Sequence, residues 1–477
     1  MSVLFQLENQ EIWKNFEALN AVPRPSKKEE RVIAFMKSFG EHLGLDTKVD
    51  AVGNVIIKKP ATVGKENAPT VILQSHLDMV HQKNNDTIFD FDKEGIQMYI
   101  DGDWVRAKGT TLGADNGLGV AAIMGVLESK TIPHPAIEAL FTIDEETGMT
   151  GAKGLVGGLL DGRILLNLDT EDDHHLDIGC AGGIDVTATA TYIPEAASVA
   201  NYYEIRVKGL NGGHSGMEIH KGLGNANKIM NRILYVLNDE HILQIASIDG
   251  GGLRNAIPRE SVAVFGSNAE VMATFDEVVT AIQSEYKSTE PNLEIVLTSI
   301  NEVGKVMPAI IQNQLLQAVY AAQNGVYKMS ADFDDLVETS NNVARVLVKD
   351  GTVKILCLTR SSVESSKMDL AQQLSATFHL MGAEVTLDGD YPGWSPNPSS
   401  AILQVMKANY EKAFGGQPDV VACHAGLECG ILATNYPGMD MISFGPTILG
   451  AHSPDERVSI SSVNKFWKLL LATLADL

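Results

Sequence analysis

Residues 70–80 read TVILQSHLDMV, an apolar run that ends in a histidine and an aspartate. The run from Thr70 to Leu73 predicts a buried strand, with His76 and Asp78 at its end. Comparable apolar runs precede other acidic or imidazole-bearing segments: 139–143 before Glu145 and Glu146, 164–168 before Asp169, and 441–444 before His452. Open α/β sheets gather ligands in the loops at strand ends. The sequence therefore predicts an α/β sheet with a ligand site along one edge.

Helices are predicted between these strands. Ser26 and Glu29 form a capping-box pattern, after which apolar residues recur at helical spacing until Gly44. A second helix is predicted over residues 117–128, and an amphipathic one over residues 462–474. Strands that alternate with helices favour a mixed, mainly parallel sheet flanked by helices.

A change of pattern near Gly183 marks a second region of the chain. From Val186 onward apolar residues alternate with threonine, and further strand patterns recur up to residue 358, with helical stretches at 224–238 and 368–381. A chain of 477 residues exceeds the roughly 250–300 that one hydrophobic core organises. We therefore predict two domains: residues 1–186 with 391–477 form the α/β domain, and residues 187–390 form an inserted α+β domain.

The charge and composition of the chain narrow its partners. A net charge of −23 argues against nucleic acid and against an anionic membrane, because both need a basic face. No segment approaches the roughly 20 apolar residues of a membrane span, and residues 1–30 lack the pattern of a signal peptide. The four cysteines are too widely spaced for a disulfide scaffold or a zinc ribbon. These features predict a cytoplasmic protein.

The residues at the predicted strand ends suit a centre of two metal ions. A catalytic zinc needs imidazole and carboxylate ligands and an open position for water, and two ions about 3.5–4 Å apart need a carboxylate between them. Asp78 can accept a hydrogen bond from His76 and so fix its tautomer. Glu145 and Glu146 are adjacent, so their side chains diverge, and one can bind metal while the other acts as a general base.

Each of these segments also has an ordinary explanation. A His-x-Asp triplet occurs in surface turns, and adjacent acids occur in solvated loops. Asp115 stands immediately before a predicted helix and suits a plain N-cap, and Asp169 and His452 are open to similar explanations. Their occurrence together, in order and in the expected local contexts, favours the metal centre.

Several longer segments are similar to one known family. They are QSHLDMV (74–80), GTTLGADNG (109–117), GGHSG (212–216), RNAIPR (254–259) and HAGLECG (424–430). Through them, and over nearly the whole chain, the sequence resembles the aminoacyl-histidine dipeptidases, or Xaa-His dipeptidases. This is a branch of the co-catalytic di-zinc peptidase superfamily, which also holds carnosinases and acyl-amino-acid deacylases.

The resemblance implies two divalent metal ions per chain. Zinc is expected, and the same ligands also accommodate cobalt or manganese. The resemblance makes Asp115 the bridging carboxylate, with His76 and Asp169 completing one metal and Glu146 and His452 the other. Glu145 is then the general base, Asp78 supports His76, and the peptide bond after Asp115 is cis.

The inserted domain resembles the lid of that family. From it His214 and Asn255 would approach the scissile carbonyl, while Arg360 and the backbone near Gly426 would bind the carboxylate of the substrate. These residue types suit such roles, because His and Asn side chains can donate to an oxyanion and Arg matches a carboxylate with two parallel hydrogen bonds.

The leading hypothesis is a cytoplasmic metallodipeptidase that hydrolyses unblocked dipeptides, preferentially Xaa-His, including the β-alanyl-histidine type. A water bridging the two metals would lose its proton to Glu145 and attack the carbonyl. The alternatives are an N-acyl-amino-acid deacylase with the same metal site and a non-catalytic metal-dependent binding protein, against which the presence of Glu145 argues. The inserted domain either pairs with a second chain or supplies a partner surface internally, and the resemblance favours a homodimer through it.

Overall fold

The computed structural model describes residues 4–84 and 86–477, which form two compact units. The first holds the described residues up to Gly179 together with 394–422 and 427–477, and the second holds 180–393 and 423–426. The predicted boundary after residue 186 differs from this division, because Gly182–Thr191 is one continuous strand of the sheet in the second unit. The short return at 423–426 had no counterpart in the predicted boundaries.

The first unit is built on an eight-stranded sheet with the order β1-β2-β6-β3-β7-β23-β8-β22. The strands are β1 (Asp46–Val49), β2 (Val55–Lys59), β3 (Val71–His76), β6 (Ile137–Thr142), β7 (Ile164–Asn167), β8 (His175–Cys180), β22 (Asp419–Cys423) and β23 (Asp440–Ser443). The central strands β6, β3, β7 and β23 run parallel, whereas β2 and β8 are antiparallel to their neighbours. The predicted mixed, mainly parallel sheet is confirmed.

Helices cover this sheet, and its strands β3 and β6 are completely buried. The helices are α1 (Gln10–Asn20), α2 (Glu30–His42), α3 (Ala114–Glu128), α4 (Thr150–Gly154), α9 (Ala401–Phe414), α10 (Glu428–Asn435) and α11 (Ile460–Asp476). All residues of β3 and β6 are buried, as expected for parallel strands covered on both faces. Helix α3 packs on β3 and α1 packs on α3, so nearly every residue of α3 is buried. A small sheet of β24 (Ile448–Leu449), β25 (Arg457–Ser459), β5 (Trp104–Ala107) and β4 (Met98–Asp101) adjoins them in this unit.

The predicted capping box at the start of α2 is wrong. The helix begins at Glu30, and no side chain caps it. The Ser26 hydroxyl instead donates to the carbonyl oxygen of Met79, and the Glu29 carboxylate accepts from the backbone N–H of Lys27. Both side chains therefore bind the loop that precedes the helix and the segment that follows His76.

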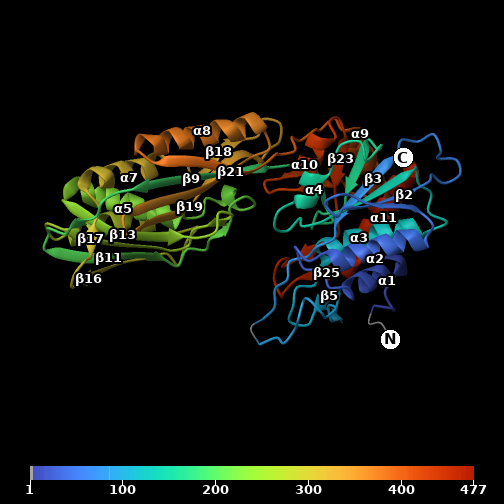
Figure 1. The fold of residues 1–477 in the computed structure, drawn as a ribbon, viewed down its shortest axis with the longest axis horizontal. Coiled ribbons are helices and arrows are strands. Elements are labelled where there is room, and N and C mark those ends of the chain that lie inside the picture. The colour runs from blue at the N-terminus through green and yellow to red at the C-terminus, as the bar shows by residue number, and fades with distance from the viewer. Residues whose placement is uncertain (1–3, 85) are drawn as a thin grey trace. The chain divides into compact units, whose positions relative to one another are not determined.

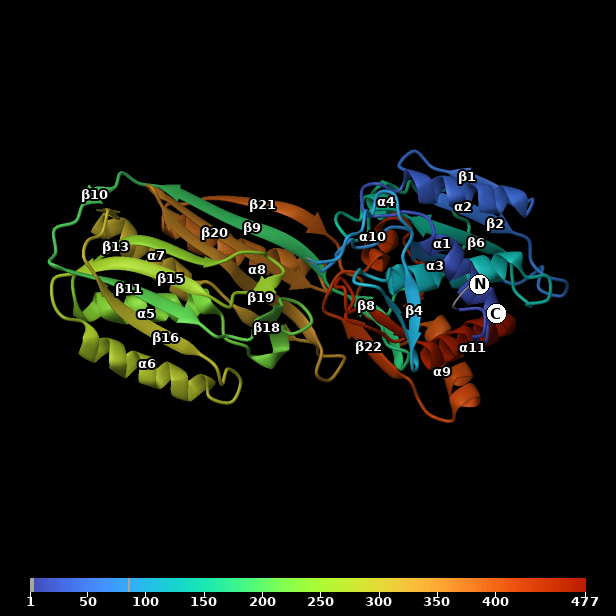
Figure 2. The ribbon, with the colours of Figure 1, turned by 90° about the horizontal axis from the view of Figure 1, so that it is seen from below.

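The second unit is a long antiparallel sheet with helices on one face (Figure 1). The sheet has the order β16-β11-β15-β13-β19-β20-β9-β21, and β18 pairs with β19. Its strands are β9 (Gly182–Thr191), β11 (Asn201–Lys208), β13 (Leu243–Gly251), β15 (Ser261–Ser267), β16 (Glu294–Ile300), β18 (Gly325–Met329), β19 (Val337–Lys349), β20 (Thr352–Ser361) and β21 (Glu384–Tyr391). Figure 2 shows β9, β20 and β21 side by side, in agreement with their pairing.

The helices of the second unit are α5 (Ala226–Glu240), α6 (Met272–Tyr286), α7 (Ala309–Ala321) and α8 (Glu364–Leu380), with a short 3-10 helix η1 (Ile219–Lys221). They bury aliphatic residues and the rings of Phe265 and Phe378 against the sheet. Two further strand pairs are β10 (Glu195–Ala196) with β17 (Lys305–Val306) and β12 (Gly213–His214) with β14 (Ala256–Ile257). The predicted α+β character of this region is confirmed. Among the described residues no helix is long and apolar enough to cross a membrane.

Candidate metal centre

The parallel centre of the first sheet gathers the candidate ligands at one edge. His76 is the last residue of β3, Glu145 and Glu146 follow β6, and Asp169 follows β7. These three strands are neighbours and run in the same direction, so their carboxyl ends meet. Asp115 lies in the first turn of α3, which packs on β3.

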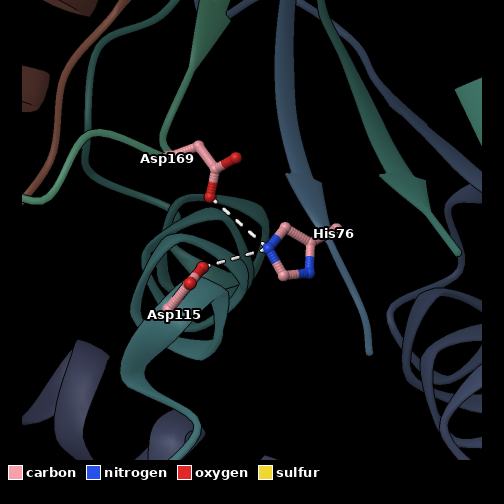
Figure 3. Close-up of side chains that lie close together, drawn as sticks. All are labelled: His76, Asp115 and Asp169. Carbon is pink, nitrogen blue, oxygen red and sulfur yellow. Dashed lines mark hydrogen bonds and ion pairs between the residues drawn. The ribbon is translucent and has the colours of Figure 1, made fainter. Parts of the chain in front are cut away.

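Asp115 stands between two separate imidazoles. His76 Nε2 lies 3.1 Å from Asp115 Oδ1 and 3.5 Å from Asp169 Oδ1 (Figure 3). His452 Nε2 lies 3.1 Å from the other oxygen of Asp115, Oδ2, and 3.0 Å from Glu146 Oε2. The structure therefore brings together all five predicted ligands in two groups that share Asp115.

The protonation of these groups reflects crowding of acids around two imidazoles. Hydrogen bonds to Asp115 and Glu146 raise the pKa of His452 to about 11. Burial acts to raise the pKa of Asp115, but the hydrogen bonds from His452 and His76 outweigh it and lower that pKa below its usual value. Burial and the charge of Asp115 raise the pKa of Glu146.

The donor set fits divalent metal ions. Glu146 Oε1 and Asp169 Oδ1 are buried and make no hydrogen bond within the described part of the chain. Buried acceptors of this kind are costly unless a donor or a cation satisfies them. Two imidazoles and three carboxylates, one of them shared, are ligands that zinc and similar ions accept.

Asp78 connects His76 to the pair of glutamates. Its Oδ1 lies 3.3 Å from His76 Nδ1 and accepts from the backbone N–H of Glu145 at 3.0 Å, while Oδ2 accepts from the N–H of Glu146 at 3.3 Å. Although burial works in the opposite direction, the hydrogen bond and charge of His76 hold the pKa of Asp78 below its usual value. An ionised Asp78 orients the imidazole so that Nε2 faces Asp115 and Asp169.

The carboxylate of Glu145 does not belong to either ligand group. Burial raises its pKa well above the usual value, and the charges of Asp169, Glu146 and Glu428 act in the same direction, opposed by His76. A carboxylate with a raised pKa beside a metal centre can accept and return a proton near neutral pH.

The peptide bond between Asp115 and Asn116 is cis, as the resemblance implied. Both residues depart from helical backbone angles inside α3. The Asn116 side chain is held on both sides, by Ser75 Oγ at its oxygen and by the carbonyl oxygen of Leu168 at its nitrogen.

The remaining predicted residues lie in the second unit. His214 ends β12 and pairs with Ala256, and the backbone N–H of Ser215 donates to the carbonyl oxygen of Asn255 at 2.8 Å. The Nδ1 atom of His214 accepts from the backbone N–H groups of Gly216 and Met217. In the neutral ring the proton therefore lies on Nε2, which makes that atom a donor.

Arg360 is buried at the end of β20, and only 4% of its surface is exposed. Its Nη1 donates to the hydroxyl of Tyr391 at 2.9 Å, and its Nε has no hydrogen-bond partner among the described residues. Gly426 lies in the short return 423–426, where the N–H of Ala181 donates to the carbonyl oxygens of Cys423 and Ala425.

His424 is a buried neighbour of this arginine that sequence reasoning missed. Its Nε2 lies 2.8 Å from Ser340 Oγ, and its Nδ1 has no hydrogen-bond partner in the described chain. Burial, followed by the positive charges of Arg360 and His214, lowers the pKa of His424 to about 3. The motif HAGLECG drew attention to the backbone near Gly426, but nothing in it distinguished His424 as a buried polar group.

A partly exposed group, Asp172, Asp173 and His174, also has metal-ligand spacing. His174 Nδ1 lies 2.8 Å from Asp173 Oδ1, and Lys465 Nζ lies 3.4 Å from the same oxygen. A lysine already compensates the charge of Asp173.

Comparison with known proteins identifies the family. Residues 72–476 match the profile of peptidase family M20/M25/M40. The chain is 42% identical over 482 aligned positions to the cytosol non-specific dipeptidase of Escherichia coli strain K12, covering 100% of this chain and 99% of that protein. It is also 42% identical to the aminoacylhistidine dipeptidase of Vibrio alginolyticus, whose crystal structure matches with a TM-score of 0.92 over 100% of this chain and 98% of that one. Human carnosine dipeptidase 1 shares the fold alone, with 13% identity and a TM-score of 0.51 over 99% of this chain and 98% of that one. The chain belongs to peptidase family M20/M25/M40.

Proposed function

We propose that this chain is a metallodipeptidase that hydrolyses unblocked dipeptides, with a preference for those that end in histidine. The observation that carries the proposal is the carboxylate of Asp115, which presents one oxygen to His76 and the other to His452. Family membership supports peptide hydrolysis, and the names of the two relatives at 42% identity support dipeptides as substrates.

In this proposal His76, Asp115 and Asp169 hold one divalent ion, and Asp115, Glu146 and His452 hold the other. Zinc is the proposed metal, and cobalt or manganese would be accepted by the same ligands. When bound, such ions lower the pKa of water and polarise a carbonyl group. Both imidazoles must be neutral to bind, so the protons that they carry beside the carboxylates are released when metal enters.

Glu145 is the general base. It takes the proton from the attacking water and gives it to the nitrogen of the leaving amine, which preserves the balance of protons over one turnover. The raised pKa of this carboxyl supports the transfer of the proton to the amine, because a weaker acid keeps the proton until the amine leaves. Asp78 fixes the backbone of Glu145 and the ring of His76 together.

The second unit supplies the groups that orient the substrate. His214 donates from Nε2, and Asn255 donates from its side chain, to the oxygen that becomes negative when the carbonyl is attacked. Arg360 and the backbone at Gly426 bind the terminal carboxylate. The unpartnered Nε of Arg360 supports this role, since a guanidinium binds a carboxylate through two parallel N–H groups.

For assembly we propose a homodimer in which residues 187–390 form the contact. The cytoplasm is the proposed location, supported by the cytosolic name of the relative from Escherichia coli. Neither a nucleic acid nor a membrane is part of the proposal, because the chain carries a net charge of −23.

The test compares free-amine dipeptides with N-acetyl amino acids on the zinc-loaded protein. We expect hydrolysis of the dipeptides alone, loss of activity with a chelator and recovery with zinc. Ala-His and His-Ala contain the same two residues, so the ratio of their kcat/KM values isolates the preference for a C-terminal histidine. If the protein cleaved N-acetyl amino acids but left dipeptides intact, it would instead be a deacylase.

A further inference from the structure

Two buried charged residues outside the proposed ligand set bind the backbone around Asp115. Glu456 is 2% exposed and follows His452 by four residues in the sequence. Its Oε2 accepts from the N–H groups of Leu112 and Gly113 at 2.7 and 3.0 Å. Its Oε1 accepts from the N–H groups of Ala114 and Asp115 at 2.7 and 3.3 Å.

These four N–H groups lie at the N-terminus of α3, where backbone donors have no partner inside the helix. The positive end of the helix dipole lies there as well, so a carboxylate is favoured at this point. Glu456 therefore ties the loop that carries His452 to the backbone of Asp115.

Arg24 binds the segment before Asp115 through a backbone carbonyl oxygen. This side chain is 1% exposed, and its Nη2 donates to the carbonyl oxygen of Gly113 at 2.6 Å. Its Nη1 donates to the carbonyl oxygens of Leu77 and Asp78 at 3.1 and 3.0 Å. The guanidinium thus joins the segment that follows His76 to the segment that precedes Asp115.

Gly113 lies at the junction of the two charged groups. Its N–H binds Glu456 and its carbonyl oxygen binds Arg24. It has a φ of +70°, and a Cβ here would lie 2.5 Å from Arg24 Nη2. A glycine is required both by the backbone conformation and by the close approach of the guanidinium.

Neighbouring carboxylates compensate the charge of Arg24 inside the protein. Burial lowers the pKa of Arg24 to about 10, opposed by the charges of Glu456 and Asp78, so the guanidinium stays protonated near neutral pH. A buried charge is tolerated when an opposite charge and hydrogen bonds accompany it. Neither residue belongs to a ligand group, so their role concerns the position of the ligands.

We propose that Glu456 and Arg24 are positioning residues that fix Asp115 relative to His76 and His452, and so set the spacing of the two metal ions. The inference rests on the proposed function, because it takes Asp115 as the shared ligand. Metal–ligand distances hold within about 0.2 Å, so small shifts of this loop would impair a shared ligand at both ions. A residue that only capped α3 would stabilise the fold without affecting metal affinity.

The test compares Glu456→Gln with Glu138→Gln. Glu138 is also 2% exposed, and it accepts from the N–H groups of Asp161 and Gly162 at 2.8 and 2.9 Å. It lies near the start of β6, whereas Glu145 and Glu146 follow the end of that strand. Both substitutions replace one oxygen of a buried carboxylate with an amide nitrogen, so they are matched in burial. Both oxygens of Glu456 face backbone N–H groups, whereas Oε1 of Glu138 pairs with Lys58 Nζ at 2.5 Å.

Zinc titrations of the chelator-treated proteins by calorimetry measure the outcome, with the absorption spectrum of the cobalt form as a second readout. We expect Glu456→Gln to weaken binding of at least one ion by about 10–100-fold, as found for residues that orient metal ligands. Its cobalt spectrum should also change. Glu138→Gln should lower the Tm but bind both ions as the wild type does.

Wild-type affinity and an unchanged cobalt spectrum in Glu456→Gln would overturn the proposal. Should Glu456→Gln fail to fold, Arg24→Lys serves under the same titration. Lysine keeps the charge but lacks the two separate Nη groups with which Arg24 binds Gly113 on one side and residues 77 and 78 on the other. Weakened zinc binding in Arg24→Lys would then support the proposal, and wild-type binding would overturn it. Failure of the wild-type protein to bind two ions would instead refute the proposed function, so the two failures are distinguishable.

Discussion

The two units differ in the unpartnered polar atoms that they bury near their predicted site residues. In the first unit the buried atoms without hydrogen-bond partners around Asp115 include two carboxylate acceptors, Glu146 Oε1 and Asp169 Oδ1. In the second unit the corresponding atoms include a donor, Arg360 Nε, together with Ser215 Oγ and His424 Nδ1. A buried polar group without a partner costs about 1–3 kcal/mol. Cations would satisfy the two carboxylate oxygens in the first unit, and an acceptor such as a carboxylate would satisfy Arg360 Nε in the second.

His452 and His424 show the same difference in their pKa values. Two neighbouring carboxylates raise the pKa of His452 to about 11, whereas burial and nearby positive charges lower the pKa of His424 to about 3. The two pKa values therefore lie on opposite sides of neutrality. The groups around His452 are therefore acidic, whereas those that act on His424 are positively charged.

The arginines of the second unit sharpen this contrast. Arg254 and Arg345 each form an ion pair, with Asp185 at 3.0 Å and with Asp249 at 2.9 Å. Arg360 forms none with the described residues, although it is buried. A buried arginine that binds only a tyrosine hydroxyl is poorly compensated, so Arg360 is the member of this set best suited to bind a ligand.

The largest expected effect separates proton transfer from metal binding in the first unit. Glu145→Gln should retain both zinc ions and lose about 10²–10⁴-fold in kcat, because it removes a general base and no ligand. Zinc content and steady-state kinetics on an Xaa-His dipeptide measure this. Asp115→Ala is the control and should lose zinc as well as activity. Near-normal turnover in Glu145→Gln would exclude it as the base.

The next effect tests whether the second unit acts on the reaction without holding metal. His214→Ala should lower kcat by about 10²–10³-fold, the usual loss for one donor to an oxyanion. Its zinc content should equal that of the wild type. His241→Ala is a suitable control, since this histidine of the same unit binds only Thr274 through Nε2. Release of a zinc ion from His214→Ala would show that His214 is a ligand.

The sequence predicted the strands of the first sheet well because the pattern there is local. An apolar run followed by a histidine or an acid marks the end of β3, and similar runs mark β6 and β7. Parallel neighbours then bring those ends together, although the residues lie far apart in the chain. The comparisons confirm the predicted family and fold class.

Contacts with backbone atoms could not be predicted. Arg24 binds three carbonyl oxygens and Glu456 binds four N–H groups, and every residue other than proline offers the same backbone atoms. The prediction of a capping box was wrong for the same reason, because the Ser26 hydroxyl donates to the carbonyl oxygen of Met79 and does not accept from a helix N–H. Pattern reasoning thus finds side chains that bind ligands more readily than side chains that bind backbone.

A smaller effect concerns Glu428, a further buried acid of the first unit. Glu428 is fully buried, and its Oε2 accepts from Gln74 Nε2 at 2.7 Å and Thr142 Oγ1 at 2.6 Å. Burial raises the pKa of Glu428 from 4.5 to about 7. The folded protein therefore binds this proton more tightly than the unfolded chain, so its stability falls as the pH rises from about 4.5 to about 7.

Glu428→Gln removes that titration while its oxygen can still accept from Gln74 and Thr142. In the metal-free protein, the stability of the variant relative to the wild type should rise by about 3 kcal/mol between those two pH values. Any penalty from the new buried amide is the same at every pH. Urea unfolding at a series of pH values measures the difference. A pH-independent difference would show that the crowding of acids in the first unit does not extend to Glu428.

The smallest expected effect tests the second unit most directly, because it concerns one ion pair with the substrate. A dipeptidase must recognise the end of its substrate, and a buried cation one residue beyond the scissile bond does so by binding the terminal carboxylate. Arg360→Ala should lower kcat/KM for a free-acid dipeptide. The loss should correspond to an increase of about 1.5–3 kcal/mol in activation free energy, the contribution of a hydrogen bond to a charged group. It should barely change kcat/KM for the same dipeptide with a C-terminal amide, which forms no ion pair with Arg360. Arg345→Ala, on the neighbouring strand β19, is the control and should affect both substrates equally. Equal losses on acid and amide in Arg360→Ala would refute carboxylate recognition, and the unpartnered guanidinium would then need another acceptor.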